Sequence, residues 1–497
     1  MSLLNTSRLR PLYRADQVRE LDRRTIAGGI DGFALMQRAA SSAWHGFRAR
    51  WPQVRSISVV CGRGNNGGDG HVLCALAAQS GLQVQRITTA PLEELSGDAA
   101  KAAELATAAG VGCEHWQPGS VFHGEVIVDA LLGTGLRGPV EGAFRQVIEA
   151  INLARKPVLA IDIPSGVEAD TGAVLGCAIQ SDCTVTFIGD KIGLYTGDAP
   201  AYTGDIDFRP LGVKFQAFQD IPPDAWLLDE CLLEEAFLPR QRIAHKGDMG
   251  HLLVLGGAPG FGGAALIASQ TAARLGAGKV SLATAPEHTT ASLVSCPEVM
   301  AHSVRGVADL GELTHQSNAL VVGPGLGQGA WGQAMLQSAL EMPCPLVVDA
   351  DGLNLLAHYW PEKQRDDWIL TPHPGEAARL LDITTAAVQE DRPAAVRALQ
   401  ERYGGSVILK GAGTLVAGPS GLVICPYGNP GMASGGMGDA LSGILGALLA
   451  QGYNIEQSAW LATLVHALAA DRAADAQGER GLLASDLAFY ARQLINP

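Results

Sequence analysis

The sequence predicts an α/β protein with two doubly wound domains, and three observations carry this prediction. Near-continuous apolar runs alternate with helical patterns, which indicates parallel strands in sheets that are covered on both faces. The 497 residues are too many for one hydrophobic core. A hydrophobic content of 47%, a charged content of 17% and 61 glycines fit a globular protein with many strand-to-helix turns.

The first domain opens with a helix expected over residues 32–51, because its apolar residues recur at helical spacing. These residues are Leu35, Ala39, Ala43 and Phe47. Strands then alternate with Ala-rich helical segments such as 71–79 and 99–109. The expected strands cover residues 56–61, 82–88, 126–132, 158–163 and 183–188.

The periodicity fails between residues 214 and 224, where Pro222-Pro223 intervenes. We therefore predict a first domain over residues 1–214, a linker over residues 215–225 and a second domain over residues 226–497. The expected strands of the second domain are 252–255, 280–283, 319–322, 346–349, 368–370, 407–410 and the pair 414–417 and 422–425 about a turn at 418–421. Its last part is expected to be helical over residues 440–451 and 456–474, and the two halves share no alignable repeat.

Charge and hydropathy argue against two classes of partner. The net charge of −14, with no extended basic patch, argues against nucleic acid. No run of about 18 apolar residues occurs, so we expect no membrane partner. No apolar core of signal-peptide length follows the N-terminus, so we expect a cytoplasmic protein. The nine cysteines form no CxxC pair, which predicts reduced thiols rather than a zinc site or a disulfide framework.

A glycine-rich run over residues 61–70 follows an expected strand and opens a helix. This is the position at which α/β folds bind phosphates and small ligands. The side-chain carbonyls of Asn65 and Asn66 can coordinate a monovalent cation or bind an amide, and Asp69 can accept hydrogen bonds from a ligand hydroxyl. An ordinary Asn-Gly turn is the alternative interpretation.

Two later strands of the first half also end in polar side chains. Asp129 precedes a second glycine loop, and the run from Ile161 to Gly166 contains Asp162 and Ser165. Because the carboxyl ends of parallel strands lie along one edge, Asn66, Asp129 and Ser165 can assemble an oxygen cage for a hard cation. Asp162 can then serve as a general acid or base. Any one of these residues alone is more often a helix cap or turn, but their recurrence at three strand ends favours a site.

In the second half, the run from Asn429 to Asp439 places glycines around one acid where an apolar helix begins. A helix N-terminus exposes unpaired N–H groups, and glycines let phosphate oxygens approach them closely. Asp439 would then take a proton from a hydroxyl that attacks the phosphoryl group. Taken alone, such a run is more often a Gly-rich turn with Asp439 as an N-cap. Further loops follow strand ends at Gly325, at His373 between two prolines and at 410–414.

The first half resembles the N-terminal epimerase domain of the NAD(P)H-hydrate repair proteins. The resemblance spans about residues 13–211 and is carried by GRGNNGGDG, VDALLGTGLRGP, DIPSGV and the segment 191–194. It implies a Rossmann-like three-layer sandwich in which Asp162 contacts the substrate and can shuttle its proton, and in which Asn66, Asp129 and Ser165 hold K⁺. It also implies that the hydrated dinucleotide is bound by Asn65, Asn66, Gly67, Gly68, Asp69, Gly133, Thr134, Gly135, Leu136, Arg137, Gly138 and Pro139.

The second half resembles the ribokinase-like family and, within it, the ADP- or ATP-dependent NAD(P)H-hydrate dehydratases. The motifs HKGxxG, TPHPGE, KGAGT and NPGMASGGMGD carry this resemblance in this order across about residues 228–493. It implies that the hydrate lies near Ala264, Gly325, His373 and Asp439, with Asp439 as the catalytic base. It also implies that ADP or ATP, with Mg²⁺ on its phosphates, is bound by Lys410, Gly411, Ala412, Gly413, Thr414 and Gly438.

The two resemblances together imply repair of damaged nicotinamide cofactors. Epimerisation would interconvert the R and S hydrates of NADH or NADPH, and dehydration of the S epimer would pass through a phosphorylated intermediate. The alternative is a ribokinase-like small-molecule kinase whose first half is a non-catalytic ligand-binding module. The choices between ADP and ATP and between NADHX and NADPHX, the epimerisation mechanism and channelling stay open, and the resemblance favours a homo-oligomer.

Overall fold

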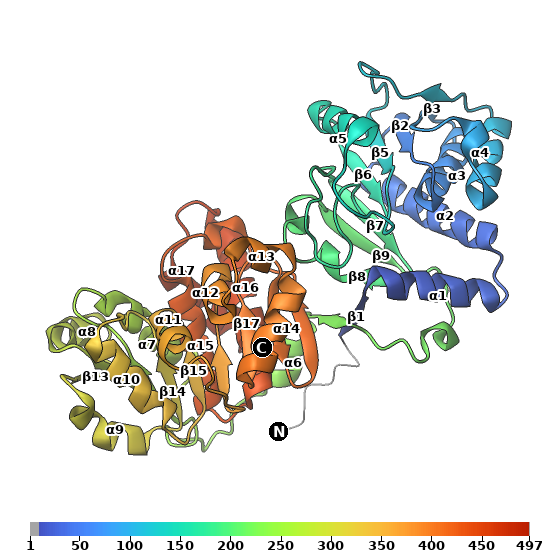
Figure 1. Ribbon diagram of the computed structural model, residues 1–497. Helices are drawn as coiled ribbons and strands as arrows, with labels where there is room; N and C mark the ends of the chain where they lie inside the picture. The colour runs from blue at the N-terminus through green and yellow to red at the C-terminus, as the bar shows by residue number, and fades with distance from the viewer. Residues whose placement is uncertain (1–8, 497) are drawn as a thin grey trace. The chain divides into compact units, whose positions relative to one another are not determined.

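The computed structural model describes residues 9–496 and separates them into two compact units (Figure 1). One unit is Pro11–Ala225, and the other begins at Trp226 and takes in Leu9 and Arg10. Both are α/β, so the predicted fold class is confirmed. Within residues 9–496, no helix combines the length and the apolar character that a membrane crossing requires.

The boundary between the units lies closer to the C-terminal end of the predicted linker than to its start. Ile221 is buried in the core of the N-terminal unit, and Phe218 packs against the same core. Most of the segment 215–225 therefore belongs to this unit. The bounds 1–214 for the epimerase domain and 226–497 for the dehydratase domain stay predictions.

The N-terminal unit is built on one parallel sheet in the order β4-β3-β2-β5-β6-β7-β9. A short parallel pair, β1 (Arg10–Tyr13) with β8 (Asp190–Lys191), accompanies it. The strands of the sheet are β2 (Ser56–Cys61), β3 (Gln83–Thr88), β4 (Glu114–His115), β5 (Val126–Ala130), β6 (Val158–Ile161), β7 (Cys183–Phe187) and β9 (Asp205–Arg209).

Helices cover both faces of this sheet, because alternate strand residues point to opposite sides. Ile57 and Val59 of β2 belong to the core that also holds α2 and α3, whereas Val60 belongs to the core that holds α5. The helices are α1 (Ala15–Ala27), α2 (Gly32–Arg50), α3 (Asn65–Gln79), α4 (Gly97–Ala108) and α5 (Gly142–Leu153).

The glycine-rich run after β2 is largely helical, and α3 begins at Asn65, six residues before the predicted start at His71. Glycine lowers helix propensity, which explains the late prediction. Close packing accounts for the glycines: a Cβ on Gly67 would lie 1.9 Å from the carbonyl oxygen of Gly62. The first turn of α3 is therefore pressed against the end of β2.

The C-terminal unit has a larger sheet in the order β13-β12-β11-β14-β15-β16-β17-β18-β19-β10. Neighbouring strands are parallel except in the β17-β18-β19 meander, where pairing is antiparallel. The strands are β10 (Ala225–Leu227), β11 (His251–Leu255), β12 (Lys279–Thr284), β13 (Met300–Ser303), β14 (Ala319–Val322), β15 (Leu346–Val348), β16 (Trp368–Leu370), β17 (Ser406–Leu409), β18 (Thr414–Gly418) and β19 (Gly421–Cys425).

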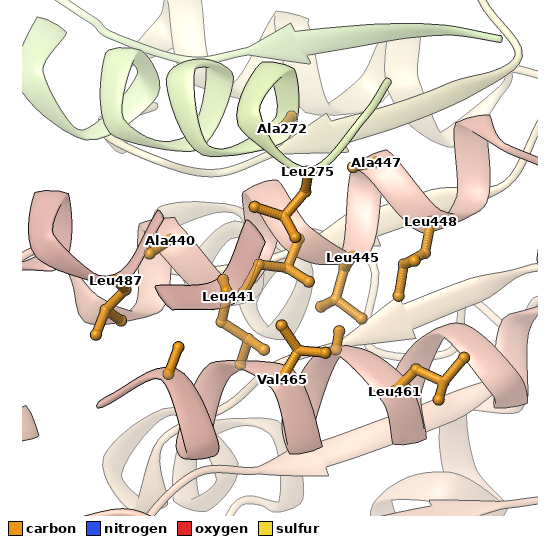
Figure 2. Packing of buried hydrophobic residues seen from close by; sticks show 14 of the residues in the cluster. Ala272, Leu275, Ala440, Leu441, Leu445, Ala447, Leu448, Leu461, Val465 and Leu487 are labelled. Atoms are coloured by element: carbon orange, nitrogen blue, oxygen red, sulfur yellow. The ribbon is translucent and has the colours of Figure 1, made fainter. Parts of the chain in front are cut away.

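Apolar helices form the main core of this unit on one face of the sheet. Figure 2 shows Leu275 near the end of α7, Leu441 and Leu445 of α15 and Val465 of α16 meeting in this core. The helices of the unit are α6 (Cys231–Ala236), α7 (Gly262–Arg274), α8 (Thr289–Ser295), α9 (Gly311–Gln316), α10 (Ala330–Leu340), α11 (Asp351–Tyr359), α12 (Pro374–Leu381), α13 (Thr385–Glu390), α14 (Arg392–Tyr403), α15 (Met437–Ala450), α16 (Ile455–Gln477) and α17 (Ala484–Leu494).

Candidate active sites

The N-terminal unit has a crevice where its strand order reverses. The chain leaves β2 toward β3 on one side and later returns to β5 on the other side. Loops at the carboxyl ends of two such strands part there and leave space for a ligand. A cavity of about 680 Å³ lies at this position. Of the residues predicted to bind substrate or to be catalytic, it is lined by Asn65, Asn66, Asp69, Gly133, Thr134, Gly135, Leu136, Arg137 and Asp162.

The remaining residues predicted for this site lie beside the cavity. Gly67 and Gly68 are buried in α3, where they allow the close packing on β2 and on Met36. Gly138 and Pro139 follow the lining segment and are not among the residues that line the cavity. Asn66 and Gly133 do meet, because a Cβ on Gly133 would lie 3.4 Å from the Cβ of Asn66.

Asp162 forms a buried ion pair at the wall of this cavity. Its carboxylate accepts a hydrogen bond from Nζ of Lys191, whose side chain has 0% exposure. Lys191 is held in turn by Thr186 Oγ1 at 2.8 Å and by the carbonyl oxygen of Phe187 at 3.3 Å. This ion pair fixes the orientation of the Asp162 side chain at the cavity wall.

Asp22 and Asp69 are among the carboxyl groups that line the cavity together with Asp162. Burial raises the pKa of Asp22 to about 6, and the charge of Asp162 adds to this shift. Burial also raises the pKa of Asp69 well above its ordinary value, with further contributions from Asp162 and Asp22. The wall therefore carries, in addition to Asp162, two carboxyl groups whose pKa values are raised, which is an arrangement suited to proton transfer.

The three residues predicted to hold a cation are connected behind the cavity. Ser165 Oγ donates to Asp129 Oδ1 at 2.7 Å, and Ser165 N donates to Asp129 Oδ2 at 2.8 Å. Asn66 Nδ2 donates to the carbonyl oxygen of Leu132 at 3.0 Å, and Leu132 N donates to Ser165 Oγ at 2.9 Å. Asn66 Oδ1 is buried and accepts no hydrogen bond from any residue in the range 9–496. An unsatisfied buried oxygen beside a carboxylate and a hydroxyl fits a hard cation.

In the C-terminal unit the strand order reverses at β11 and β14. The loop after β14 carries Gly325, and α7 begins after the loop that follows β11. A Cβ on Gly325 would lie 3.3 Å from the Cβ of Ala264, so these two predicted hydrate-binding residues are neighbours. They lie where a doubly wound fold binds its ligand.

Lys410 and Asp349 form the centre of the second site. Lys410 Nζ lies 2.9 Å from Asp349 Oδ1, which also accepts from Thr371 Oγ1 at 2.8 Å. Ser442 Oγ donates to Asp349 Oδ2 at 2.8 Å. Burial would raise the pKa of Asp349, but the charge of Lys410 and these hydrogen bonds outweigh it, and the pKa is lowered. Asp349 is therefore a fully ionised anchor that positions the lysine.

Asp439 lies in the first turn of α15, immediately after the glycine loop. Gly436 precedes the helix with φ +91°, a conformation that favours glycine. Gly438 faces the ion pair, since its Cβ would lie 3.3 Å from Lys410 Nζ and 3.6 Å from Asp349 Oδ2. Burial raises the pKa of Asp439 to about 7, Asp349 adds to the rise and Lys410 opposes it. A carboxyl group of this kind is balanced between its two protonation states at neutral pH.

His373 is the N-cap of α12 and is linked to the same group of charges through Glu376. The backbone N–H of His373 donates to Glu376 Oε2 at 2.8 Å, and Glu376 Oε2 lies 3.8 Å from Lys410 Nζ. Burial raises the pKa of Glu376 to about 7. Burial and the neighbouring cations lower the pKa of His373. The predicted residues His373, Lys410, Gly438 and Asp439 are thus brought together.

The loop predicted to bind nucleotide follows Lys410. Thr414 Oγ1 donates to the carbonyl oxygen of Gly411 at 2.9 Å, which closes the turn through Ala412 and Gly413. The guanidinium of Arg392 is buried beneath the loop and donates to the carbonyl oxygen of Lys410 at 3.4 Å. The hydrogen bond from Arg392 therefore fixes the start of this loop.

Several residues of the two sites were not assigned a role from the sequence. Asp349, Glu376 and Thr371 lie in the strand-end motifs, so the position of each after a strand was a usable signal. Asp22 and Ser442 lie on helix faces, and no local pattern marks them. Lys191 lies in a segment that supported the family resemblance, but only the structure shows its contact with Asp162.

Comparison with known proteins covers both halves of the chain. A family model described as NAD(P)H-hydrate dehydratase matches residues 252–492, and one described as YjeF-related protein N-terminus matches residues 32–193. A crystal structure of a hypothetical protein from Streptococcus mutans is similar in fold, with a TM-score of 0.50 and 26% identity, over 54% of this chain and 98% of that chain.

Two curated relatives extend over almost the whole chain. The bifunctional NAD(P)H-hydrate repair enzyme Nnr of Coxiella burnetii is 47% identical over 487 residues, which are 98% of this chain and 99% of that protein. The enzyme of the same name from Escherichia coli is 41% identical over 494 residues, covering 98% of this chain and 94% of that protein. This chain therefore belongs to the family of bifunctional NAD(P)H-hydrate repair enzymes, which join an epimerase to a dehydratase.

Proposed function

We propose that Asp439 is the base of the dehydration reaction in the C-terminal unit. The observation that carries the proposal is its position: it lies in the first turn of α15, beside the Lys410–Asp349 pair, with its pKa raised by burial to about 7. A base with this pKa can take a proton at neutral pH and is not locked in either state.

Phosphorylation explains why a ribokinase-like unit would remove water. Hydroxide is a poor leaving group, so Asp439 deprotonates the C6 hydroxyl of the hydrated ring as that hydroxyl attacks the terminal phosphorus of ADP or ATP. The bond from this phosphorus to the nucleotide breaks, and AMP or ADP leaves. The lone pair of the ring nitrogen then expels the phosphate from C6, and loss of a proton from C5 forms the C5–C6 double bond that restores NADH or NADPH.

Lys410 and the glycine loop stabilise the transferring phosphoryl group. The lysine is positioned by Asp349, and burial, which would lower its pKa, is outweighed by the charges of Asp349, Glu376 and Asp439. It therefore stays a cation. The N–H groups at the start of α15 add the positive end of the helix dipole. We propose that the nucleotide is held along residues 410–414, and that Mg²⁺ enters with it on its phosphate oxygens.

We propose that the N-terminal cavity epimerises the hydrate with Asp162 as the group that moves the proton. The ion pair with Lys191 fixes the orientation of Asp162, and Asp69, whose pKa is raised by burial, supplies a second carboxyl group for proton transfer on the same wall. Ring opening or loss and return of water at C6 would exchange the two epimers. Only one epimer presents its hydroxyl to Asp439, so epimerisation lets the whole pool be repaired.

We further propose that Asn66, Asp129 and Ser165 hold K⁺ behind this cavity. The unsatisfied Asn66 Oδ1 supports this assignment, since the other two side chains already exchange hydrogen bonds. A cation there supplies positive potential under the substrate. Asn66→Ala should raise the K⁺ concentration needed for half-maximal epimerisation, and an unchanged K⁺ dependence would contradict the assignment. Cytoplasmic location and a homo-oligomeric assembly stay part of this proposal.

The decisive experiment follows NADPH absorbance from a mixture of R and S NADPH hydrate with ADP or ATP. Wild type should convert the whole mixture, Asp162→Asn about half of it and Asp439→Asn none. Spontaneous epimerisation is measured in parallel without enzyme, because it blurs the half-conversion. Activity retained by Asp439→Asn would refute the assignment of the base. Accumulation of a phosphorylated product, without NADPH and free phosphate, would instead indicate a kinase.

A further inference from the structure

A cavity of about 220 Å³ lies in the C-terminal unit between α7 and α17. From α7 it is lined by Ile267, Gln270 and Arg274, and from α17 by Ser485, Phe489 and Arg492. These residues recur at three- and four-residue spacing, so each helix turns one face toward the cavity.

Two arginines with no bound partner meet in this cavity. Arg274 and Arg492 are exposed, and among residues 9–496 neither guanidinium donates a hydrogen bond or lies within 4.0 Å of a carboxylate. The pKa of Glu298 is lowered by a backbone hydrogen bond and by its hydrogen bond with Cys296, and the charge of Arg274 adds to this effect. Glu298 nevertheless forms no ion pair with Arg274. Two guanidinium groups that line one small cavity repel each other until an anion lies between them, and their planar forks match phosphate oxygens.

The wall of the cavity lies against the glycine loop that precedes α15. A Cβ on Gly436 would lie 3.1 Å from Ile267 Cδ1 and 3.1 Å from the Cβ of Ala484, the residue before Ser485. One end of the cavity therefore lies next to Gly436, which precedes Asp439 by three residues in the sequence. From Ile267 to Arg274 the axis of α7 rises about 10 Å. This is the scale on which a ribose separates a nucleotide base from its phosphate.

We propose that this cavity binds the diphosphate bridge of the NAD(P)H hydrate, with Arg274 and Arg492 as the anion-binding residues. The inference rests on the proposed function, because it places the hydrated ring at Asp439. Ala264, predicted to contact the hydrate, lies one turn before Ile267 on α7, so this helix forms a track from the ring to the arginines. Phe489, 64% exposed at the cavity, offers an apolar face beside the bridge.

The phosphates of ADP or ATP are the competing source of the same chemistry. They are expected along residues 410–414, which follow β17, whereas the cavity is formed by α7 and α17. The two sources make different kinetic predictions. Loss of a diphosphate site for the hydrate raises KM for the hydrate alone, whereas loss of a nucleotide site raises KM for ADP.

The test compares wild type with Arg274→Ala, Arg492→Ala and the double variant in the full-length enzyme. Steady-state dehydration is measured with S-NADPH hydrate and with S-NADH hydrate, each with ADP. Arg305→Ala is the matched control, since it removes an exposed arginine of the same unit that does not line this cavity. Thermal unfolding of each variant shows whether it is folded.

The double variant should raise KM for both hydrates about 10-fold or more, the loss expected for charge-assisted hydrogen bonds. The kcat, KM for ADP and the melting temperature should stay near wild type. A rise in KM for ADP, or a loss confined to the NADPH hydrate, would overturn the assignment to the diphosphate. Unchanged kinetics in the folded double variant would overturn it too.

A binding arm separates this proposal from the proposed function. NADPH, which has the same diphosphate, is titrated calorimetrically into wild type and the double variant. Loss of one class of sites in the double variant supports the cavity even if wild type fails to dehydrate the hydrate, in which case only the proposed function fails. Identical binding in both proteins contradicts the cavity.

Discussion

Lys410→Met removes the cation from a buried ion pair and leaves Asp349 without its counter-charge. The two charged atoms are 2.9 Å apart, and the side chains are 22% and 2% exposed. Breaking a buried pair from one side costs about 3–5 kcal/mol. The partial exposure of the lysine places the expected loss in the free energy of unfolding at the lower end, about 3 kcal/mol. At about 2–4 °C per kcal/mol for a unit of this size, Tm should fall by about 6–12 °C.

The pH dependence of this loss has a defined sign. In wild type the pKa of Asp349 is lowered, because Lys410 and hydrogen bonds outweigh burial, so its stabilisation is present above the unfolded pKa of about 3.9 and is lost as pH falls through the folded value. Without Lys410 the effect of burial dominates and the folded pKa rises above the unfolded one. The variant should therefore lose stability as pH rises, and its deficit should be smaller at pH 5 than at pH 7.

Calorimetry of the nucleotide-free protein at both pH values measures these differences, so that lost ligand binding does not contribute. Asp349→Asn and the double variant Lys410→Met/Asp349→Asn complete a double-mutant cycle. The double variant should be more stable than the sum of the two single losses predicts, because no unpaired charge stays buried. A Tm for Lys410→Met within about 2 °C of wild type, or strictly additive losses, would refute the reasoning.

Three further predictions concern single groups. The dehydration rate should rise as pH increases through about 7, because Asp439, whose pKa is raised to about 7 by burial and by Asp349, must be ionised to take the proton; a flat profile would contradict its role. Burial lowers the pKa of His71 to about 4, so stability should fall as pH drops from about 6.5 toward 4, and His71→Leu should flatten this limb in urea unfolding at pH 5 and 7. Gly67→Ala should cost at least about 1–3 kcal/mol, because its Cβ would lie 1.9 Å from a carbonyl oxygen, whereas Gly64→Ala meets no atom within 4 Å; equal melting temperatures would refute the difference.

The parallel strands were the most predictable part of the fold. The bounds expected for residues 56–61, 319–322 and 368–370 agree with β2, β14 and β16, because buried parallel strands are continuous apolar runs between turn residues. Short or polar strands such as β1, β9 and β13 were missed, since pairing with a neighbour defines them and their own sequence does not. The early start of α3 was missed because the glycines of its first turn have a low helix propensity and are there for close packing.

The site residues were predictable where polar side chains follow the carboxyl end of a strand. Asn66, Asp129 and Ser165 are joined by hydrogen bonds through Leu132 because parallel strands bring their carboxyl ends to one edge. The partners of these groups were less visible. Ser442 reaches Asp349 across 93 residues of sequence, and Lys191 reaches Asp162 across 29. Such pairs depend on tertiary packing, which no local spacing encodes.

The backbone at Asp162 restricts which residues evolution can try there. Its φ is +68°, a left-handed conformation that Asn and Asp tolerate better than other non-glycine residues. Most substitutions at this position therefore carry a conformational penalty of about 1–3 kcal/mol in addition to any loss of chemistry. A lineage that abandoned epimerisation would be expected to drift first to Asn or Gly, and a β-branched residue there would indicate that the whole turn had been rebuilt.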